Sequence, residues 1–249
     1  MTKINRSFLL FLLAIFLFLS ITTNAEEVGD DDEPFMKEDE SFQDVTDDEK
    51  GNKAVKKAKY VKPTINGEHF FLETFETDLI GSKWIKSKAK KEDVDEVIAK
   101  YDGEWTIESS MDAVLEGDKG LVLKSKAKHH AISARLSKPF DFKSAHSLVI
   151  QYEVKFQNPM ECGGAYIKLI SDEPSFSLDN FYDKTGFTIM FGPDKCGPDN
   201  KFHLIIRYKH PKTGAYEEKH VKKSELPEGL FTDTKTHLFT LIMREDNTY

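Results

Sequence analysis

Cysteine and tryptophan are scarce in this chain of 249 residues, with two of each. Neither cysteine belongs to a Cys-x-x-Cys pair or to a nearby Cys/His cluster, which argues against a zinc site. No serine, cysteine or histidine stands in a recognisable nucleophile context. The cluster of Glu92, Asp93, Asp95 and Glu96 lies in a polar stretch without the aromatic cleft of a glycoside hydrolase. The sequence therefore predicts that the protein is not an enzyme.

An excess of basic residues is also lacking. The chain has 35 lysines and arginines against 43 acidic residues, a formal net charge of −8. Binding driven by phosphate groups requires a basic surface, so we expect no nucleic-acid partner. Long apolar runs are restricted to one place near the N-terminus.

That apolar run has the pattern of a signal peptide over residues 1–25. Lys3 and Arg6 precede twelve apolar residues, Phe8 to Leu19, and small residues follow at Thr23 and Ala25. Twelve residues are too few to span a bilayer, which requires about 20. We therefore expect mature residue one to be Glu26 and the protein to enter the secretory pathway.

The oxidising conditions of that pathway favour a disulfide between Cys162 and Cys196. Both residues lie in glycine-rich contexts, and two thiols in such a compartment pair more often than they remain free. On the chain-entropy account, closing this loop stabilises the fold by about 4 kcal/mol.

Residues 26–62 are predicted to be disordered, first acidic and then basic. They show neither helical nor alternating apolar periodicity. The Asp30–Glu33 cluster lacks the spacing and the glycine of an EF-hand loop.

From residue 63 onward the pattern is that of an all-β sandwich domain, 63–249. Apolar residues alternate through Leu148–Phe156 and again through Phe202–Tyr208. Further strands are expected at 121–123, 165–170, 187–191 and 237–243, with turns at 192–194 and 212–214 and one helical turn within 92–100. Adjacent residues of a strand point to opposite faces, so His129 and His130 do not predict a metal site. The last expected strand has no partner after it, which predicts a sandwich that is incomplete at its C-terminal side.

Two long phrases, Glu161–Leu169 and Ile189–Gly197, are similar to the signature motifs of the calnexin and calreticulin family. The resemblance extends over residues 68–249 through 84–91, 98–103, 128–133 and 216–220. Ser87–Lys91 and Ala127–Ser133 resemble the calnexin branch in particular.

The resemblance implies a legume-lectin-like, concanavalin-type jelly-roll sandwich interrupted by a proline-rich arm, with a transmembrane helix in calnexins. We expect the arm, the final strands and the helix to lie outside these 249 residues. The implied function is that of a calcium-dependent lectin chaperone on the lumenal side of the endoplasmic reticulum membrane. It would bind monoglucosylated high-mannose N-glycans on unfolded glycoproteins, and the arm would recruit an oxidoreductase. A soluble calreticulin-like calcium-binding chaperone and a jelly-roll glycoside hydrolase are the alternatives.

The resemblance also assigns sugar contacts to Tyr166, Lys168, Met190 and Glu218. Strand alternation places Tyr166 and Lys168 on one face, with Ile167 and Leu169 toward the core. Phe187 stands where the family has tyrosine, which predicts weaker sugar binding because one hydroxyl is missing. Phe187 and Met190 are three residues apart, so a straight strand would not place both on one face, and a bulge is the alternative.

Calcium ligands are implied at Thr74 and Asp118, the former through its backbone oxygen. The alternative for Asp118 is a turn before Leu121.

Overall fold

The structure, a computed structural model, describes residues 12–17, 57–143, 147–222 and 226–249. These residues form strands almost throughout, with one turn of α-helix, α1 (Glu96–Ala99), and one 3-10 turn (Leu178–Asn180). Among the described residues, no helix has the length and apolar character needed to cross a membrane. The strands are β1 (Leu12–Leu17), β2 (Ile85–Lys86), β3 (Trp105–Glu108), β4 (Gly120–Leu123), β5 (His130–Arg135), β6 (Leu148–Lys155), β7 (Cys162–Gly164), β8 (Tyr166–Leu169), β9 (Ile189–Cys196), β10 (Asp199–Lys209), β11 (Tyr216–His220) and β12 (Thr236–Met243).

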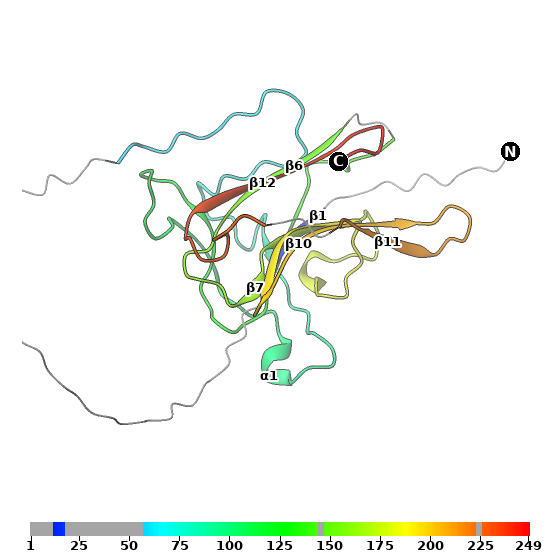
Figure 1. The fold of residues 1–249 in the computed structure, drawn as a ribbon, viewed down its shortest axis with the longest axis horizontal. Coiled ribbons are helices and arrows are strands. Elements are labelled where there is room, and N and C mark those ends of the chain that lie inside the picture. The colour runs from blue at the N-terminus through cyan, green and yellow to red at the C-terminus, as the bar shows by residue number, and fades with distance from the viewer. Residues whose placement is uncertain (1–11, 18–56, 144–146, 223–225) are drawn as a thin grey trace, which may run out of the picture.

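One large antiparallel sheet organises the molecule (Figure 1). Its strand order is β11-β10-β9-β8-β1-β5-β2, and β7 pairs with β9 beside β8. The β9–β10 ladder runs from Cys196 opposite Asp199 to Ile189 opposite Ile206. This sheet brings the two signature phrases together, since β7 and β8 come from the first and β9 from the second.

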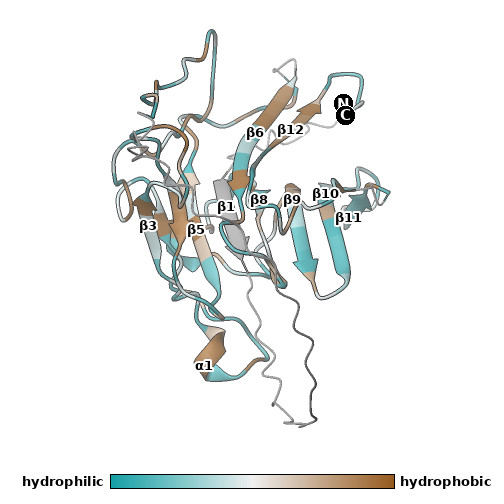
Figure 2. Cartoon of the chain, turned by 60° about the vertical axis from the view of Figure 1, so that its left-hand side comes forward, coloured by the Kyte–Doolittle hydropathy of each residue, from teal (hydrophilic) through white to brown (hydrophobic). Residues whose placement is uncertain are grey.

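The inner face of the large sheet is covered by two strand pairs. β6 and β12 pair over their full length, and their inward residues, such as Ile150 and Phe239, pack on a core that includes Ile167, Ile189 and Phe191. Figure 2 shows hydrophobic residues along both strands. The alternation predicted for Leu148–Phe156 is thus confirmed, because Leu148, Ile150 and Tyr152 face this core and the next two alternate residues face a neighbouring apolar cluster.

The pair β3–β4 covers the other end of the same face. Trp84, Trp105 and Ile132 form a buried cluster there, with Leu121 and Leu123 of β4 packed against it. Two layers of antiparallel strands enclosing apolar cores confirm the predicted all-β sandwich.

The outer face of the large sheet is covered by a segment that we call the roof, residues 170–187. Side-chain hydroxyls hold it at three points. Ser133 Oγ donates to the Leu178 carbonyl (2.8 Å), Ser87 Oγ to the Phe181 carbonyl (2.5 Å), and Tyr101 Oη to the Asp183 carboxylate (3.0 Å). Phe181, a residue of the roof itself, is fully buried. No apolar periodicity predicts this segment.

The turn predicted at Gly192–Asp194 is wrong, because these residues continue β9. Gly192 adopts φ 137°, which only glycine reaches without strain. Pro193 needs no amide donor at its position, and its carbonyl accepts from the Ala165 amide (2.8 Å). The turn predicted at Lys212–Gly214 does occur, with Gly214 at φ 71°.

β1 lies within the predicted signal peptide, and the remainder of residues 1–25 lies outside the described residues. Most of the segment 26–62, predicted to be disordered, also lies outside them. Its end is described, and the Tyr60 amide donates there to the Glu116 carbonyl (2.9 Å).

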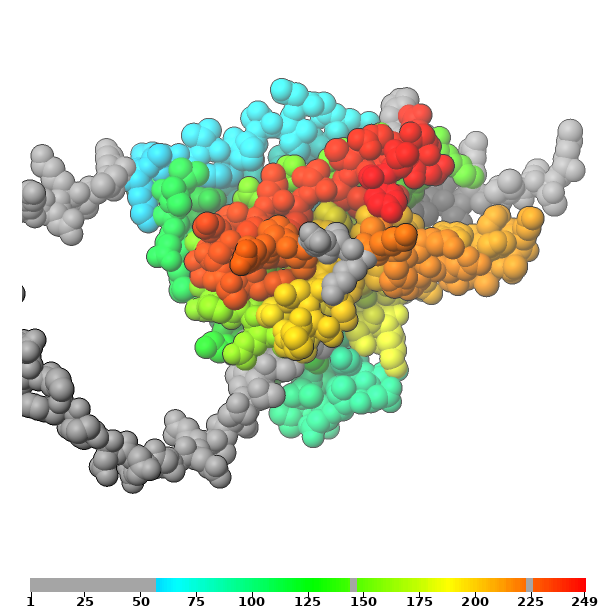
Figure 3. Space-filling model, viewed as in Figure 1, coloured from blue at the N-terminus to red at the C-terminus, as the bar shows by residue number. Residues whose placement is uncertain are grey.

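The surface carries some apolar side chains on the outer side of the β6–β12 pair. Val149 and Leu238 are both more than half exposed. In the space-filling view, β12 (red) lies on the near surface and the β10–β11 end (orange) projects to the right (Figure 3).

Candidate functional site

Three of the predicted sugar contacts meet where β8 and β9 pair. Lys168 is aligned with Met190 in the β8–β9 register. The Lys168 ammonium lies 5.0 Å from the centroid of the Phe187 ring and donates to the Asp183 carbonyl (3.0 Å). A cation over an aromatic face is an attractive arrangement, so the ring and the ammonium fix each other's position.

Phe187 and Met190 pack in the same cluster because Phe187 precedes the strand, which begins at Ile189. The Thr188 amide donates to the Leu169 carbonyl (2.7 Å), although Leu169 is aligned with Ile189. The chain therefore bends at Thr188 just before β9, and the alternation of the strand does not extend back to Phe187. The strand predicted at 187–191 thus begins two residues later than predicted, at Ile189.

Tyr166 and Ile167 lie on opposite faces, as alternation predicts. Tyr166 packs in the cluster under the roof, whereas Ile167 and Leu169 pack in the inner core. The outer face is nevertheless not an open surface. Tyr166 is 9% exposed and Lys168 4% exposed, because the roof covers them.

Burial determines the electrostatics of this position. Desolvation lowers the pKa of Lys168 to about 8, against attraction from Asp183 and Glu218, and the positive Arg207 lowers it further. Burial likewise raises the pKa of the Tyr166 phenol, so it remains a neutral hydrogen-bonding group at neutral pH.

Glu218 lies farther out, on the edge strand β11. It is aligned with Arg207 of β10, and its carboxylate is 3.2 Å from His220 Nε2. Its charge still acts on Lys168. The structure thus groups the five predicted sugar residues on one side of the large sheet, with four near β8 and β9 and Glu218 at the rim.

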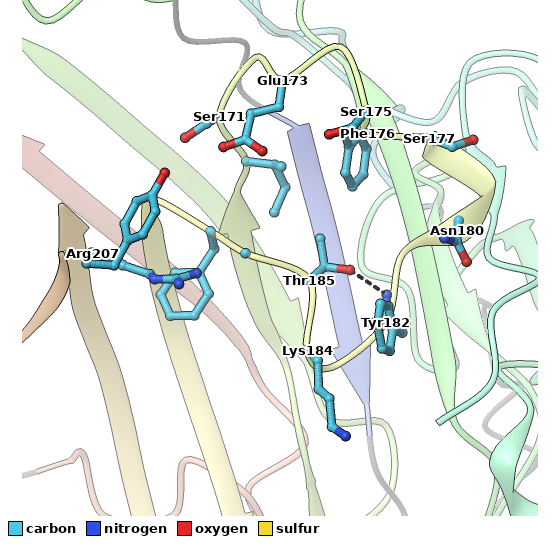
Figure 4. A pocket seen from close by; sticks show the side chains of 14 residues that line it. Ser171, Glu173, Ser175, Phe176, Ser177, Asn180, Tyr182, Lys184, Thr185 and Arg207 are labelled. Carbon is cyan, nitrogen blue, oxygen red and sulfur yellow. Dashed lines mark hydrogen bonds between the residues drawn. The ribbon is translucent and has the colours of Figure 1, made fainter. Parts of the chain in front are cut away.

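A cavity of about 420 Å³ opens beside Phe187 (Figure 4). Roof residues form one wall, including Ser171, Tyr182 and Thr185, and Arg207 and Tyr216 form the other. Hydroxyl groups and aromatic rings therefore line the same space, a combination suited to a ligand with both polar and C–H surfaces.

Arg207 and Tyr216 are lining residues that sequence reasoning missed. The Arg207 guanidinium stacks on the Tyr216 ring, 4.6 Å from its centroid. Alternation could have found Arg207, because the predicted strand Phe202–Tyr208 puts Leu204 and Ile206 on one face and Arg207 on the other. The roof residues gave no such signal, since they belong to no periodic segment.

The two cysteines are joined by a disulfide across neighbouring strands. Cys162 of β7 is aligned with Cys196 of β9, and their Cα atoms are 3.9 Å apart. The bond ties the two signature phrases together next to Tyr166.

The two implied calcium ligands lie in one neighbourhood, around Tyr60. The Tyr60 phenol hydrogen-bonds with Thr74, and its pKa is raised by burial and by the nearby charges of Glu76 and Asp118. Oxygen donors of this kind suit calcium, but Glu76 is already paired with Lys62 (2.8 Å). Within the described ranges, no group of three or more His, Cys, Asp or Glu residues is placed to hold a metal ion. These residues offer oxygen atoms of the type that calcium binds. They are fewer than the roughly six to eight oxygen ligands that a calcium ion takes in proteins.

Comparisons with known proteins agree with this geometry. The chain matches the family described as the calreticulin family over residues 71–249. It is 52% identical to human calmegin over 235 residues, 94% of this chain and 37% of the relative, and 40% identical to Caenorhabditis elegans calnexin over 250 residues, 99% of this chain and 39% of the relative. The T. cruzi calreticulin globular domain has a similar fold, with a TM-score of 0.55 and 31% identity over 72% of this chain and 59% of that one.

The chain spans less than two fifths of the length of the two curated relatives named here. The alternative of a glycoside hydrolase is removed, because this family consists of chaperones and not enzymes. A match over residues 71–249, with relatives above 30% identity along nearly the whole chain, shows that the chain belongs to the calreticulin family.

Proposed function

We propose that this chain carries the sugar-binding part of a lectin chaperone of the endoplasmic reticulum that binds monoglucosylated high-mannose N-glycans on unfolded glycoproteins. The observation that carries the proposal is the meeting of Lys168, Phe187 and Met190 beside a cavity lined with hydroxyl and aromatic groups. A pyranose ring presents hydroxyls at its edge and C–H groups on its faces, and this site offers a partner for each.

The residues have distinct roles in this proposal. The Phe187 ring stacks on a C–H face of the terminal glucose, and the Lys168 ammonium donates to hydroxyl oxygens. Glu218 accepts from hydroxyls at the rim, and charge-assisted bonds of this kind are stronger than neutral ones. Because the roof covers Tyr166, the sugar approaches from the cavity side, between Phe187 and Arg207.

Calcium belongs to the proposal as a structural ion near Thr74 and Asp118. It would crosslink the segment that precedes β2 to the turn that precedes β4, and so stabilise the fold at a distance from the sugar. The same family membership supports a location in the endoplasmic reticulum membrane with this domain in the lumen. An oxidoreductase partner, recruited through a proline-rich arm outside these residues, completes the proposal.

Isothermal titration calorimetry on the whole chain tests the proposal. Two high-mannose oligosaccharides that differ only in the terminal glucose are titrated, with calcium and with a chelator. We expect binding only of the glucosylated sugar, and a lower thermal unfolding midpoint in the chelator. Equal binding of both sugars, or heat that is unchanged when Lys168 is replaced, would contradict the assignment.

A further inference from the structure

Tyr101 is buried among the residues assigned to the sugar. It is 3% exposed and packs in the same apolar cluster as Tyr166 and Met190, and Phe187 packs against that cluster. It lies in the phrase 98–103, between α1 and β3, which is one of the phrases that carry the family resemblance. The roles given above to the sugar residues do not include it.

The Tyr101 phenol holds Asp183 of the roof through two hydrogen bonds. Its oxygen donates to the Asp183 carboxylate (3.0 Å) and accepts from the Asp183 amide (2.9 Å). The side chain and the backbone of Asp183 are therefore fixed by the same atom. Burial raises the pKa of the phenol, so the proton that it donates is present at neutral pH.

Asp183 in turn holds Lys168. Its carbonyl accepts from the Lys168 ammonium (3.0 Å), and its charge attracts that ammonium. Because the amide and the carboxylate of Asp183 are both bonded to Tyr101, the carbonyl of the same residue has little freedom to turn. The ammonium also lies 5.0 Å from the centroid of the Phe187 ring, so a displacement of Asp183 would move it relative to that ring.

The neighbouring contacts of the roof act on other residues or are weaker. Ser133 donates to the Leu178 carbonyl (2.8 Å). Lys184 pairs with Glu92 (2.5 Å), but both side chains are about half exposed, and pairs of this kind contribute little to stability. A buried phenol with two short hydrogen bonds is thus the firmer of the attachments at this end of the roof.

We propose that Tyr101 is a positioning residue for sugar recognition, which fixes the Lys168 ammonium through Asp183 without itself touching the sugar. The use of this positioning rests on the proposed function, whereas the positioning itself rests on the hydrogen bonds just described. A donor that is already held in place loses less conformational freedom when a ligand binds, which favours affinity. Loss of the phenol oxygen should therefore weaken sugar binding although every contact to the sugar is kept.

NMR of the whole chain with carbon-13 at the Cε atoms of lysine reports where Lys168 lies. The Phe187 ring should shift the ε-methylene resonance of Lys168 from the usual lysine position, and Lys168→Met identifies the signal by its disappearance. In Tyr101→Phe, which removes only the oxygen, we expect this resonance to move toward the usual position. Ser133→Ala, the matched control, removes a different roof contact and should leave it in place.

Two substitutions of Asp183 separate its geometry from its charge. Asp183→Asn removes the charge but keeps an oxygen that accepts from the Tyr101 phenol, so the Lys168 resonance should stay near its unsubstituted position. Asp183→Ala removes that acceptor and should reproduce Tyr101→Phe, and it takes the place of Tyr101→Phe if that variant does not fold. If the asparagine variant behaves as the alanine variant does, the charge and not the phenol positions the lysine, and the proposal fails.

Isothermal titration calorimetry with the monoglucosylated oligosaccharide extends the test to the sugar. We expect Tyr101→Phe to weaken binding roughly fivefold. The double variant with Asp183→Ala should bind no more weakly than either single variant, since both break the same link. Equal weakening by Ser133→Ala, or an unmoved lysine resonance in Tyr101→Phe, would overturn the proposal. If the unsubstituted chain binds no sugar, the proposed function is contradicted, and the lysine resonance by itself decides whether Tyr101 positions Lys168.

Discussion

The Lys168 ammonium lies 5.0 Å from the centroid of the Phe187 ring, although the two residues are 19 positions apart in the sequence. The bend at Thr188, just before β9, makes this contact possible, because it brings Phe187 to the side of β8 on which Lys168 lies. The contact also holds the ring at the edge of the cavity, where a bound sugar would meet it.

Restoring a hydroxyl at this ring should strengthen sugar binding. We expect Phe187→Tyr to improve affinity by about 1 kcal/mol, since the new phenol adds one hydrogen bond to a sugar hydroxyl. Calorimetry with the monoglucosylated oligosaccharide measures the change. Phe176→Tyr, at another roof residue that lines the same cavity, is the matched control and should have little effect. Equal gains from the two variants would mean that position 187 has no particular role.

Removing the charge at Lys168 should weaken sugar binding while it stabilises the fold. Lys168 is 4% exposed, and burial lowers the pKa of its ammonium to about 8, so the charged form is held at a cost to the fold. We expect Lys168→Met to weaken sugar binding at least tenfold, while the free energy of unfolding rises by about 1 kcal/mol.

Urea denaturation and calorimetry on the same preparations check both parts. Lys201→Met, at an exposed position of β10, provides the control and should change neither quantity. A marked loss of stability in Lys168→Met would show that the ammonium is a structural group and would refute the separation.

His130 should make the fold sensitive to acid. Burial lowers the pKa of its imidazole from 6.5 to about 4, and its Nε2 has no hydrogen-bond partner among the described residues. Between pH 6.5 and 4, the unfolded chain takes up a proton that the folded chain refuses. The free energy of unfolding is therefore highest above pH 6.5 and falls by about 3 kcal/mol in total as the pH is lowered to 4.

Unfolding curves recorded at half-unit steps of pH measure this loss. His130→Leu should flatten the dependence in that window, whereas His69→Leu, at an exposed position, should leave it as it is. If the free energy of unfolding of His130→Leu still falls with pH in this window, the loss of stability comes from other groups.

Gly192 should tolerate no side chain. Its φ of 137° strains any other residue, and an added Cβ would collide with the Tyr152 hydroxyl and lie 2.8 Å from the Tyr166 Cα. We expect Gly192→Ala to destabilise the fold by about 3 kcal/mol or more, through strain and overpacking together. Gly120→Ala is the matched control, because a Cβ there meets no atom within 4 Å. Thermal unfolding of the two variants should differ clearly, and similar midpoints would count against this account of β9.

The strands that the sequence predicted well are those with one buried face. In β6, Leu148, Ile150 and Tyr152 face the inner core while Val149 faces outward, so burial imposes the period of two that the sequence shows. β12 follows the same rule, with Leu241 buried and Leu238 and Ile242 exposed. The sugar residues of β8 and β9 were found through a resemblance, and alternation alone supported only part of that set.

The features that sequence reasoning missed depend on contacts between distant residues. Gly192–Asp194 has the composition of a turn, but Gly192 is required by the approach of Tyr152 and Tyr166 from other strands. The roof is held by Ser87, Tyr101 and Ser133, none of which is near it in the sequence. Local patterns carry no information about such partners, so a cavity wall made by the roof could not be predicted.

The hydrogen bond from Ser87 to Phe181 joins residues 94 positions apart, which affects the order in which the domain can form during translation. Because a protein is synthesised from its N-terminus, Ser87 and Ala131 leave the ribosome before Phe181 has been added to the chain. The nascent chain therefore carries an uncovered apolar face until synthesis has passed Asp183, and contacts of such long range also slow folding. A protein proposed to attend the folding of others would thus itself depend, while it is being made, on protection from aggregation.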